Sequence, residues 1–253
     1  ANPAQALRGK VAGVQISQTN GEPGGGINIR VRGNSSVRSG NDPLIVVDGI
    51  PLAGGNISAG GSDIGLGSSA SKSALNFINQ DDIESITVLK DASSTAIYGS
   101  RGANGVVIIT TKGGKSGKAQ FDFSTSVSMS SLRGDIDMMD GDQYAERVNT
   151  LGLSEDFGSR SYDWKDAILQ NAVSTDYNLG ITFGNETSSN RVSFGMQNSE
   201  GIVQNTGMQR YSISFDNKST AFDGILTLNT KLDYSQIEDQ AELTSDNVGF
   251  IGN

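Results

Sequence analysis

The 253-residue chain contains no cysteine, no histidine, only 4 prolines and 1 tryptophan. Without cysteine and histidine it has no disulfide, no zinc site built on those ligands, no thiol nucleophile and no histidine-based triad. No apolar run approaches the roughly 18 residues of a membrane-spanning helix, although membrane β-strands give a much weaker sequence signal. The lack of cysteine leaves the compartment open, because oxidising and reducing spaces both tolerate it.

Basic residues are also few, with 19 Lys and Arg against 28 Asp and Glu and a net charge of -9. A nucleic-acid surface needs clustered cations to displace counterions from phosphates, so we expect no nucleic-acid partner. An acidic surface also disfavours adhesion to anionic lipid headgroups. Glycine is abundant, at 33 residues without a three-residue period, which is typical of a β-rich chain with many turns.

Residues 1–115 show a mixed α and β pattern. The sequence predicts a short helix at Gln5–Arg8, a strand at Gly13–Ser17 and a half-buried alternating strand at 27–32. The apolar run LIVV at 44–47 predicts a buried strand that ends in an Asp-Gly turn. Polar and small residues between these segments predict long loops, which in compact domains are often functional.

Residues 83–114 predict a strand, a helix, a tight glycine turn and a second strand. Val88 and Leu89 belong to the first strand, 106–109 to the second, and Asp91 is expected to N-cap the helix between them. Three glycines are expected to let the chain turn back into the sheet, namely Gly99, Gly102 and Gly105.

From about residue 119 the chain alternates apolar side chains with small polar ones. The pattern predicts antiparallel strands with one apolar face, interrupted at 132–172 by an excursion with two short helices. The alternating segments are 121–129, 177–183, 192–196, 211–215 and 226–234. A soluble β-sandwich would alternate too, and the low apolar content of the second face favours a barrel with a polar lumen.

No local motif supports a catalytic or metal site. Gly24–Gly26 is more typical of a turn than of a phosphate nest. The stretch 65–73 differs from a phosphate-binding loop because Ser71 stands where a glycine must precede the lysine. The stretch 135–143 fails as a calcium loop because Met139 occupies a ligand position, so its acids are expected to cap or turn the chain.

Several charged residues remain to be explained. Asp81, Asp82 and Glu84 are expected before a strand, and two acids at a helical turn there favour N-capping over acid–base catalysis. Arg30 and Arg32 share one face of a strand and Lys90 ends another. Surface solvation is the default interpretation of these cations, and a partner wall over that face would need matching carboxylates.

Several stretches together resemble the SusC/RagA family of TonB-dependent outer-membrane transporters of Bacteroidota, over most of residues 4–236. They are LRGKVAGVQI, INIRVRGNSS, PLIVVDGIP, INQDDIESITVLKDASSTAIYGSRGANGVVIITTKGG and NSEGIVQNTGMQRYSIS. The resemblance implies an α+β plug domain at 1–115, with a mixed small sheet and short helices. It also implies that 119–253 supplies antiparallel strands from the N-terminal part of a 22-stranded transmembrane β-barrel. We therefore expect the other strands, the N-terminal extension and the TonB box to lie outside this sequence.

The resemblance also implies a function. We expect TonB-dependent import of an oligosaccharide or peptide nutrient across the bacterial outer membrane, with the plug gating the barrel and contributing to ligand binding. The implied partners are a SusD-like surface lipoprotein, the TonB-ExbB-ExbD complex and outer-membrane lipid, and no enzyme activity, cofactor or metal is expected. The alternative is a soluble or surface-exposed β-rich binding module without transport activity.

The resemblance also implies site residues, which are assigned only by their corresponding positions in the family. The loops at 18–26, 34–42 and 52–73 are expected to face the ligand. Their candidate residues are Asn20, Glu22, Asn34, Ser35, Arg38, Asn41, Asn56, Ser58 and Asp63. Arg32 and Lys90 are expected to pair with acids of the barrel wall. The incomplete strand set predicts an open, curled sheet that could associate edge to edge with a second copy.

Overall fold

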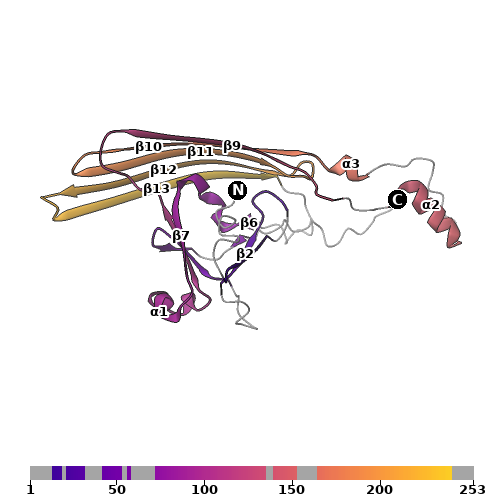
Figure 1. The fold of residues 1–253 in the computed structure, drawn as a ribbon, viewed down its shortest axis with the longest axis horizontal. Helices are drawn as coiled ribbons and strands as arrows, with labels where there is room; N and C mark the ends of the chain where they lie inside the picture. The colour runs from indigo at the N-terminus through magenta and orange to yellow at the C-terminus, as the bar shows by residue number, and fades with distance from the viewer. Residues whose placement is uncertain are drawn as a thin grey trace, which may run out of the picture.

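The computed structural model describes residues 13–18, 21–31, 42–52, 56–57, 72–134, 139–152 and 164–240. They form two parts (Figure 1). A sheet of five long strands, here called the wall, lies over a smaller assembly of short strands and helical turns, here called the N-terminal unit. The expected helix at Gln5–Arg8 lies outside the described residues.

The N-terminal unit is built on a four-stranded mixed sheet in the order β4-β3-β8-β7. The central strands β3 and β8 are parallel, and the outer pairs are antiparallel. Two antiparallel pairs, β1 with β2 and β5 with β6, accompany this sheet. The bounds are β1 Gln15–Gln18, β2 Ile27–Arg30, β3 Leu44–Val47, β4 Ile50–Pro51, β5 Asn56–Ile57, β6 Lys72–Ser73, β7 Ile83–Leu89 and β8 Val106–Thr111.

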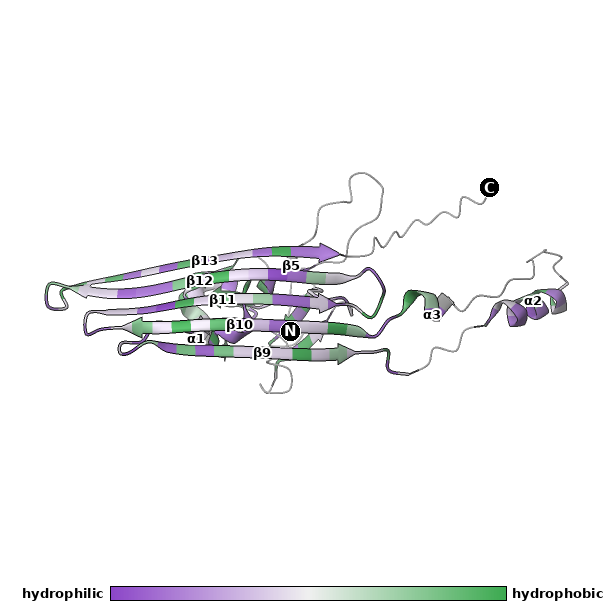
Figure 2. Cartoon of the chain, turned by 90° about the horizontal axis from the view of Figure 1, so that it is seen from above, coloured by the Kyte–Doolittle hydropathy of each residue, from purple (hydrophilic) through white to green (hydrophobic). Residues whose placement is uncertain are grey.

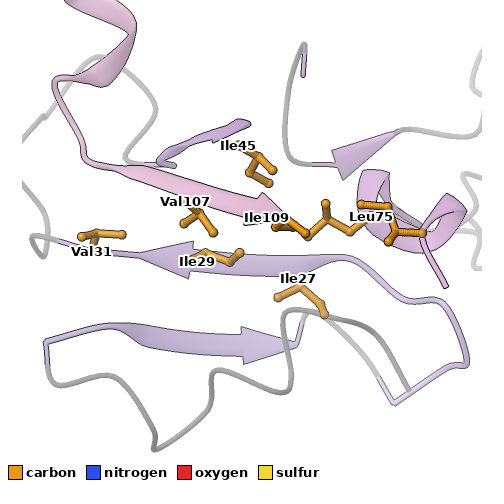
Figure 3. Close-up of a cluster of buried hydrophobic side chains, with 8 residues drawn as sticks. Ile27, Ile29, Val31, Ile45, Leu75, Val107 and Ile109 are labelled. Atoms are coloured by element: carbon orange, nitrogen blue, oxygen red, sulfur yellow. The ribbon is translucent and has the colours of Figure 1, made fainter. Parts of the chain in front are cut away.

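A single apolar cluster holds the N-terminal unit together (Figure 3). Alternate residues of β2 point inward and meet β3, β8 and the 3-10 turn η3 (Ala74–Phe77). Val106 and Val107, which point to opposite faces of β8, are 0% and 1% exposed, as expected for a strand covered on both faces. Each such side chain contributes about 1.5–3 kcal/mol by leaving water. The cluster comprises Ile27, Ile29, Val31, Ile45, Leu75, Ile78, Val107 and Ile109.

The segment between β7 and β8 is helical, as predicted, but in two pieces. A short α-helix, α1 (Ala92–Thr95), is followed by the 3-10 segment η5 (Ala96–Gly102). Asp91 occupies the N-cap position, but the prediction that its side chain caps the helix is wrong. Its backbone carbonyl instead accepts hydrogen bonds from the hydroxyls of Ser94 and Thr95.

The three glycines of this segment have two different roles. Gly99 and Gly105 adopt positive φ angles of 59° and 98°, a region that side chains disfavour. A Cβ on Gly105 would also lie 2.9 Å from Cγ1 of Val31. Gly102 has no positive φ, and it is needed because a Cβ there would lie 2.9 Å from the carbonyl oxygen of Thr95.

The wall is an antiparallel meander in the order β13-β12-β11-β10-β9. The strands are β9 (Gln120–Ser130), β10 (Ala172–Gly184), β11 (Ser188–Glu200), β12 (Gly207–Ala221) and β13 (Leu226–Gln240). Each strand pairs with its neighbour in sequence, and within the described residues β9 and β13 form open edges. The five predicted alternating segments are therefore confirmed as strands.

The two faces of the wall differ in chemistry. Side chains that face away from the N-terminal unit are large, apolar and exposed, and Figure 2 looks onto this face. Strand register places them in cross-strand rows, of which one is Phe123, Leu179, Phe194, Ile213 and Tyr234. The neighbouring row, which points to the opposite face, consists of small or polar residues, namely Ser124, Asn178, Gly195, Ser212 and Ser235. The period-2 alternation thus separates an apolar outer face from a polar inner face.

The excursion between β9 and β10 contains the two predicted helices, α2 (Gly141–Thr150) and α3 (Trp164–Ile168), which lie beyond one end of the sheet (Figures 1 and 2). Asp140 caps α2 by accepting a 2.8 Å hydrogen bond from the backbone N–H of Gln143, whose side chain bonds back to the Asp140 N–H. The prediction that acids of this segment cap the chain is confirmed at Asp140. Among the described residues, no helix combines the length and hydrophobicity needed to cross a membrane.

Candidate functional site

The inner face of the wall contacts the N-terminal unit through the turn at 79–82. Asn79 caps the 3-10 turn η4 (Gln80–Asp82), because its Oδ1 accepts a 3.1 Å hydrogen bond from the Asp81 N–H. This turn projects two carboxylates toward the wall. The interpretation of Asp81 and Asp82 as capping residues is therefore wrong, since the neighbouring asparagine caps. Asp81 Oδ2 instead accepts a 3.0 Å hydrogen bond from the Ser124 hydroxyl of β9.

Asp82 forms a buried ion pair with Arg191 of β11. Arg191 Nη2 lies 3.3 Å from Asp82 Oδ1, and the Ser193 hydroxyl donates a 2.7 Å hydrogen bond to Asp82 Oδ2. Arg191 is 5% exposed and its Nη1 lies 2.9 Å from Oδ2 of Asp122, a wall residue. A buried charge pair is favourable only when its remaining hydrogen-bonding groups are also satisfied. Ser193 and Thr182 supply such bonds here, whereas Nε of Arg191 has no partner within the described residues.

A second wall arginine donates hydrogen bonds to the backbone of the N-terminal unit. Arg210 of β12 is 2% exposed, and its Nη1 donates to the carbonyl oxygens of Asn76 and Ile78 at 3.2 and 2.9 Å. These carbonyls lie at the end of η3 and would otherwise be buried acceptors facing the wall. Hydrogen bonds from a charged donor are the stronger kind, so this arginine anchors the segment that leads into the 79–82 turn.

Two lysines form further ion pairs across the interface. Lys72 Nζ of β6 lies 3.5 Å from Oδ1 of Asp239 in the wall and 3.8 Å from Oε2 of Glu22. On the other side, Lys231 Nζ of β13 lies 2.5 Å from Oδ2 of Asp48, in the turn between β3 and β4. Charges of both signs therefore come from both sides of the interface.

Asp48 also accepts hydrogen bonds from the backbone N–H and hydroxyl of Thr111, at 2.9 and 3.0 Å. Burial raises the pKa of Asp48, but the hydrogen bonds and charge of Lys231 together with the Thr111 bonds outweigh it and lower the pKa overall. The carboxylate is thus held in its charged form. The φ angles of Asp48 and Gly49, 47° and 86°, match the predicted Asp-Gly turn.

Two glycines of the wall leave room for these contacts. A Cβ on Gly195 of β11 would lie 2.2 Å from Nδ2 of Asn79 and 2.6 Å from Oγ of Ser212. A Cβ on Gly180 of β10 would lie 2.3 Å from Oδ2 of Asp122 and 2.5 Å from Nη2 of Arg191. At both positions these distances are too short for any residue that has a Cβ. We name the Gly195 position the notch, because the amide of Asn79 occupies it.

A cavity of about 460 Å³ lies between Gln18, residues 21–25 and the inner faces of β9 to β12. Serine hydroxyls of the wall line much of it, together with Asn76 and Gln197. Its ionisable lining residues are Glu22, Asp176, Glu200 and Arg210. The cavity therefore offers many neutral hydrogen-bonding groups and more carboxylates than cations.

The structure places only part of the predicted site residues. Glu22 lines the cavity and also faces Lys72. Asn56 lies in β5. The other predicted ligand-facing residues lie outside the described residues, namely Asn20, Asn34, Ser35, Arg38, Asn41, Ser58 and Asp63.

The structure does not test the prediction that Arg32 and Lys90 pair with acids of the barrel wall. Arg32 lies outside the described residues. Lys90 is half-buried, and its Nζ lies 3.6 Å from the position that a Cβ on Gly13 would take. Its pairing with a wall acid stays a prediction. The ion pairs of Asp48, Lys72 and Asp82 with the wall were not anticipated from the sequence.

The contacts described so far are hydrogen bonds and ion pairs. Within the described ranges, no group of three or more Asp and Glu side chains is placed to hold a metal ion. The arrangement is that of a folded unit docked on a polar wall.

A family model of the TonB-dependent receptor plug domain matches residues 1–106. The chain is 40% identical over 232 residues to the TonB-dependent receptor SusC of Bacteroides thetaiotaomicron, covering 90% of this chain and 22% of that protein. It is 36% identical over 210 residues to the TonB-dependent receptor P3 of Formosa agariphila, covering 83% of this chain and 19% of that protein.

Among solved structures, the RagAB peptide importer in its closed-closed state matches with a TM-score of 0.80 at 24% identity. That match covers 95% of this chain and 29% of the RagAB chain. The siderophore receptor PirA of Acinetobacter baumannii matches at a TM-score of 0.54 and 19% identity, over 90% of this chain and 28% of that one. These likenesses show the fold.

The chain belongs to the SusC/RagA type of TonB-dependent receptors. The N-terminal unit is its plug domain, and the wall consists of antiparallel strands that match the start of the receptor barrel. The resemblance stated from the sequence is thereby confirmed, as is the fold class. The chain spans about a fifth of the length of the curated relatives, 22% of SusC and 19% of P3.

Proposed function

We propose that this chain gates an outer-membrane importer that takes up an oligosaccharide or peptide nutrient with energy supplied through TonB. Residues 1–115 would form the plug and 119–253 the first part of the barrel. The whole transporter would lie in the outer membrane of a Bacteroidota-like bacterium, and import would need no covalent chemistry.

The observation that carries this proposal is the amphipathic wall with the plug docked on its polar face. The outer face exposes large apolar side chains row after row, such as Phe121, Phe123 and Val127 at 66–71% exposure. Contiguous apolar surface of this extent marks contact with lipid or another partner. The inner face holds the plug through noncovalent polar contacts, which can break and re-form.

The same face argues against the alternative, a soluble or surface-exposed binding module. Such a module would have to cover its apolar rows or aggregate. The relatives named above are receptors with a plug, so they do not favour that alternative either.

The polar lining of the cavity beside Gln18 and residues 21–25 supports the proposal that the ligand is polar. Its serine, asparagine and glutamine side chains hydrogen-bond equally well to sugar hydroxyls and to peptide groups. SusC and RagAB relatives support a SusD-like lipoprotein as the partner that delivers the ligand, and the TonB-ExbB-ExbD complex as the partner that drives the plug.

The proposal can be tested with a plug that is crosslinked to the wall. In a full-length transporter freed of any other cysteine, Asp81→Cys and Ser124→Cys introduce a thiol pair where the two side chains are now hydrogen-bonded. A short bis-maleimide, which reacts with one thiol at each end, is expected to abolish uptake of the nutrient that supports growth of the wild type but not of the deletion strain. Each single-cysteine variant serves as the matched control and should retain uptake.

The nutrient is found by comparing growth of the deletion strain and the wild type on a panel of oligosaccharides and peptides. Undiminished uptake by the crosslinked transporter would contradict gating by the plug. Equal growth of the two strains on every compound would contradict the importer itself.

A further inference from the structure

We propose that Asp122 is a release carboxylate, which competes with the plug residue Asp82 for Arg191 and so makes undocking of the plug easier. The inference deepens the proposed function, because it assigns a residue that controls how firmly the gate is held. It rests on the three-member ionic cluster at the plug–wall interface.

The geometry of the cluster divides Arg191 between two carboxylates. Nη2 faces Asp82 of the plug at 3.3 Å, and Nη1 faces Asp122 of the wall at 2.9 Å. Asp122 is on β9 and Arg191 on β11, so their side chains meet across β10. They can do so because the β10 residue between them is Gly180, where a Cβ would collide with both groups.

This wall-internal bridge does not depend on the plug. Asp122, Gly180 and Arg191 all belong to wall strands, so the pair persists when the plug moves away. Breaking an isolated buried ion pair is costly because it leaves a charge without a counterion. Here Arg191 keeps a counterion in both states, and that cost is reduced.

Asp122 also opposes docking directly. With two carboxylates around one guanidinium, the cluster carries one excess negative charge, and Asp122 repels Asp82 when the plug is docked. The side chain of Asp122 is 55% exposed, so this repulsion is partly screened by water. Both effects act in the same direction, toward weaker retention of the plug.

A second cluster at the interface has the same composition with the roles exchanged. The plug residue Lys72 faces Glu22 of the plug at 3.8 Å and Asp239 of the wall at 3.5 Å. When the plug moves away, Lys72 therefore retains Glu22 as a counterion from the plug itself. Two independent clusters therefore share an arrangement that suits repeated docking and release.

The test measures how often the plug leaves the wall. Asn178 lies on the inner face of β10 opposite the notch residue Gly195, is 5% exposed, and its Nδ2 makes no hydrogen bond within the described residues. Asn178→Cys in the full-length transporter, purified in detergent without TonB, provides a thiol that a maleimide reaches when the plug undocks. The labelling rate in sub-denaturing urea is compared among variants on this background.

The two carboxylates are expected to act in opposite directions. Asp82→Asn should raise the labelling rate about tenfold or more, because it removes the plug's own partner for a buried cation. Asp122→Asn and Asp122→Ala should each lower the rate about two- to fivefold, the range of a partly exposed charge interaction. Glu186→Gln, an exposed acid in the turn after β10, is the control for net charge and should leave the rate unchanged.

The double variant isolates the competition. In the Asp82→Asn background, Asp122→Asn should no longer slow labelling, because its effect acts through Asp82. An unchanged or faster rate for both Asp122 variants overturns the proposal, and so does equal slowing in the two backgrounds. Labelling needs no substrate, so the expected order of rates combined with absent uptake would contradict the proposed function and leave this inference standing.

Discussion

Replacing Gly195 with alanine tests whether the notch holds the plug. The new Cβ would lie 2.2 Å from Nδ2 of Asn79 and 2.6 Å from Oγ of Ser212, so something must move. Ser212 can rotate its hydroxyl away. Asn79 cannot swing freely, because its Oδ1 caps the turn that carries Asp81 and Asp82.

The expected cost follows from three contributions. Overpacking of a well-filled contact costs about 1–3 kcal/mol, and loss of an N-cap costs about 1 kcal/mol. Alanine in a strand recovers about 0.5–1 kcal/mol, because glycine loses more backbone freedom on folding. Since strain and cap loss are alternative ways to relieve one clash, we expect net destabilisation of the docked plug by about 1–2 kcal/mol. This corresponds to about a five- to thirtyfold larger undocked population.

The assay is equilibrium urea unfolding of the full-length transporter in detergent, with the plug followed by pulse proteolysis. Gly21→Ala is the matched control, because Gly21 has no positive φ and a Cβ there meets nothing within 4 Å. Asn79→Ser should rescue Gly195→Ala, since serine keeps a capping oxygen on a shorter side chain. A coupling energy between the two sites below about 0.3 kcal/mol would refute the notch, because contacting residues couple by more.

Three further outcomes are expected. Asp48→Asn should destabilise the plug by about 0.5–1 kcal/mol at pH 7; because the folded pKa of Asp48 lies below its unfolded value of about 4, the difference from wild type should stay constant above that pH and shrink as the pH falls from there through the folded pKa, and a difference that stays constant to lower pH would contradict the ion pair. Arg210→Met should destabilise the docked plug by about 2–3 kcal/mol by orphaning two carbonyls, with Arg210→Lys recovering less than half, whereas a lysine variant equal to wild type would show that the two bonds are not needed. Asp140→Ala should speed hydrogen exchange in α2 about fivefold without changing the plug's urea midpoint, and Asp142→Ala is its control.

Much of the fold could be predicted because it depends on local pattern. Alternation with period 2 identified the wall strands, and the buried run at 44–47 identified the central strand of the plug. Helix α2 lies in the excursion at 132–172, where two short helices were predicted, and its N-cap Asp140 belongs to the stretch whose acids were expected to cap or turn the chain. What failed was side-chain detail at turns, since Asp91 occupies an N-cap position without capping.

The plug–wall contacts could not be predicted because they join distant parts of the chain. Asp82 and Arg191 are 109 residues apart, and Arg210 and Ile78 are 132 apart. Their meeting depends on where the plug sits along the wall, which no local pattern encodes. The expectation of plug cations facing wall acids named Arg32 and Lys90 and stays a prediction. Among the observed pairs Lys72 is a plug cation, and the other two place the acid on the plug.

One signal in the sequence did point to this interface. Gly180 and Gly195 stand at polar-face positions of long strands, where glycine weakens the strand and gives no side chain to pack. Such a glycine marks a place where another group approaches closely. In the wall, one admits the Asp122–Arg191 bridge and the other admits Asn79 of the plug. Gly195 therefore locates a plug contact more directly than the charges do, because a charge can be satisfied by water and the missing Cβ at this position is required by geometry.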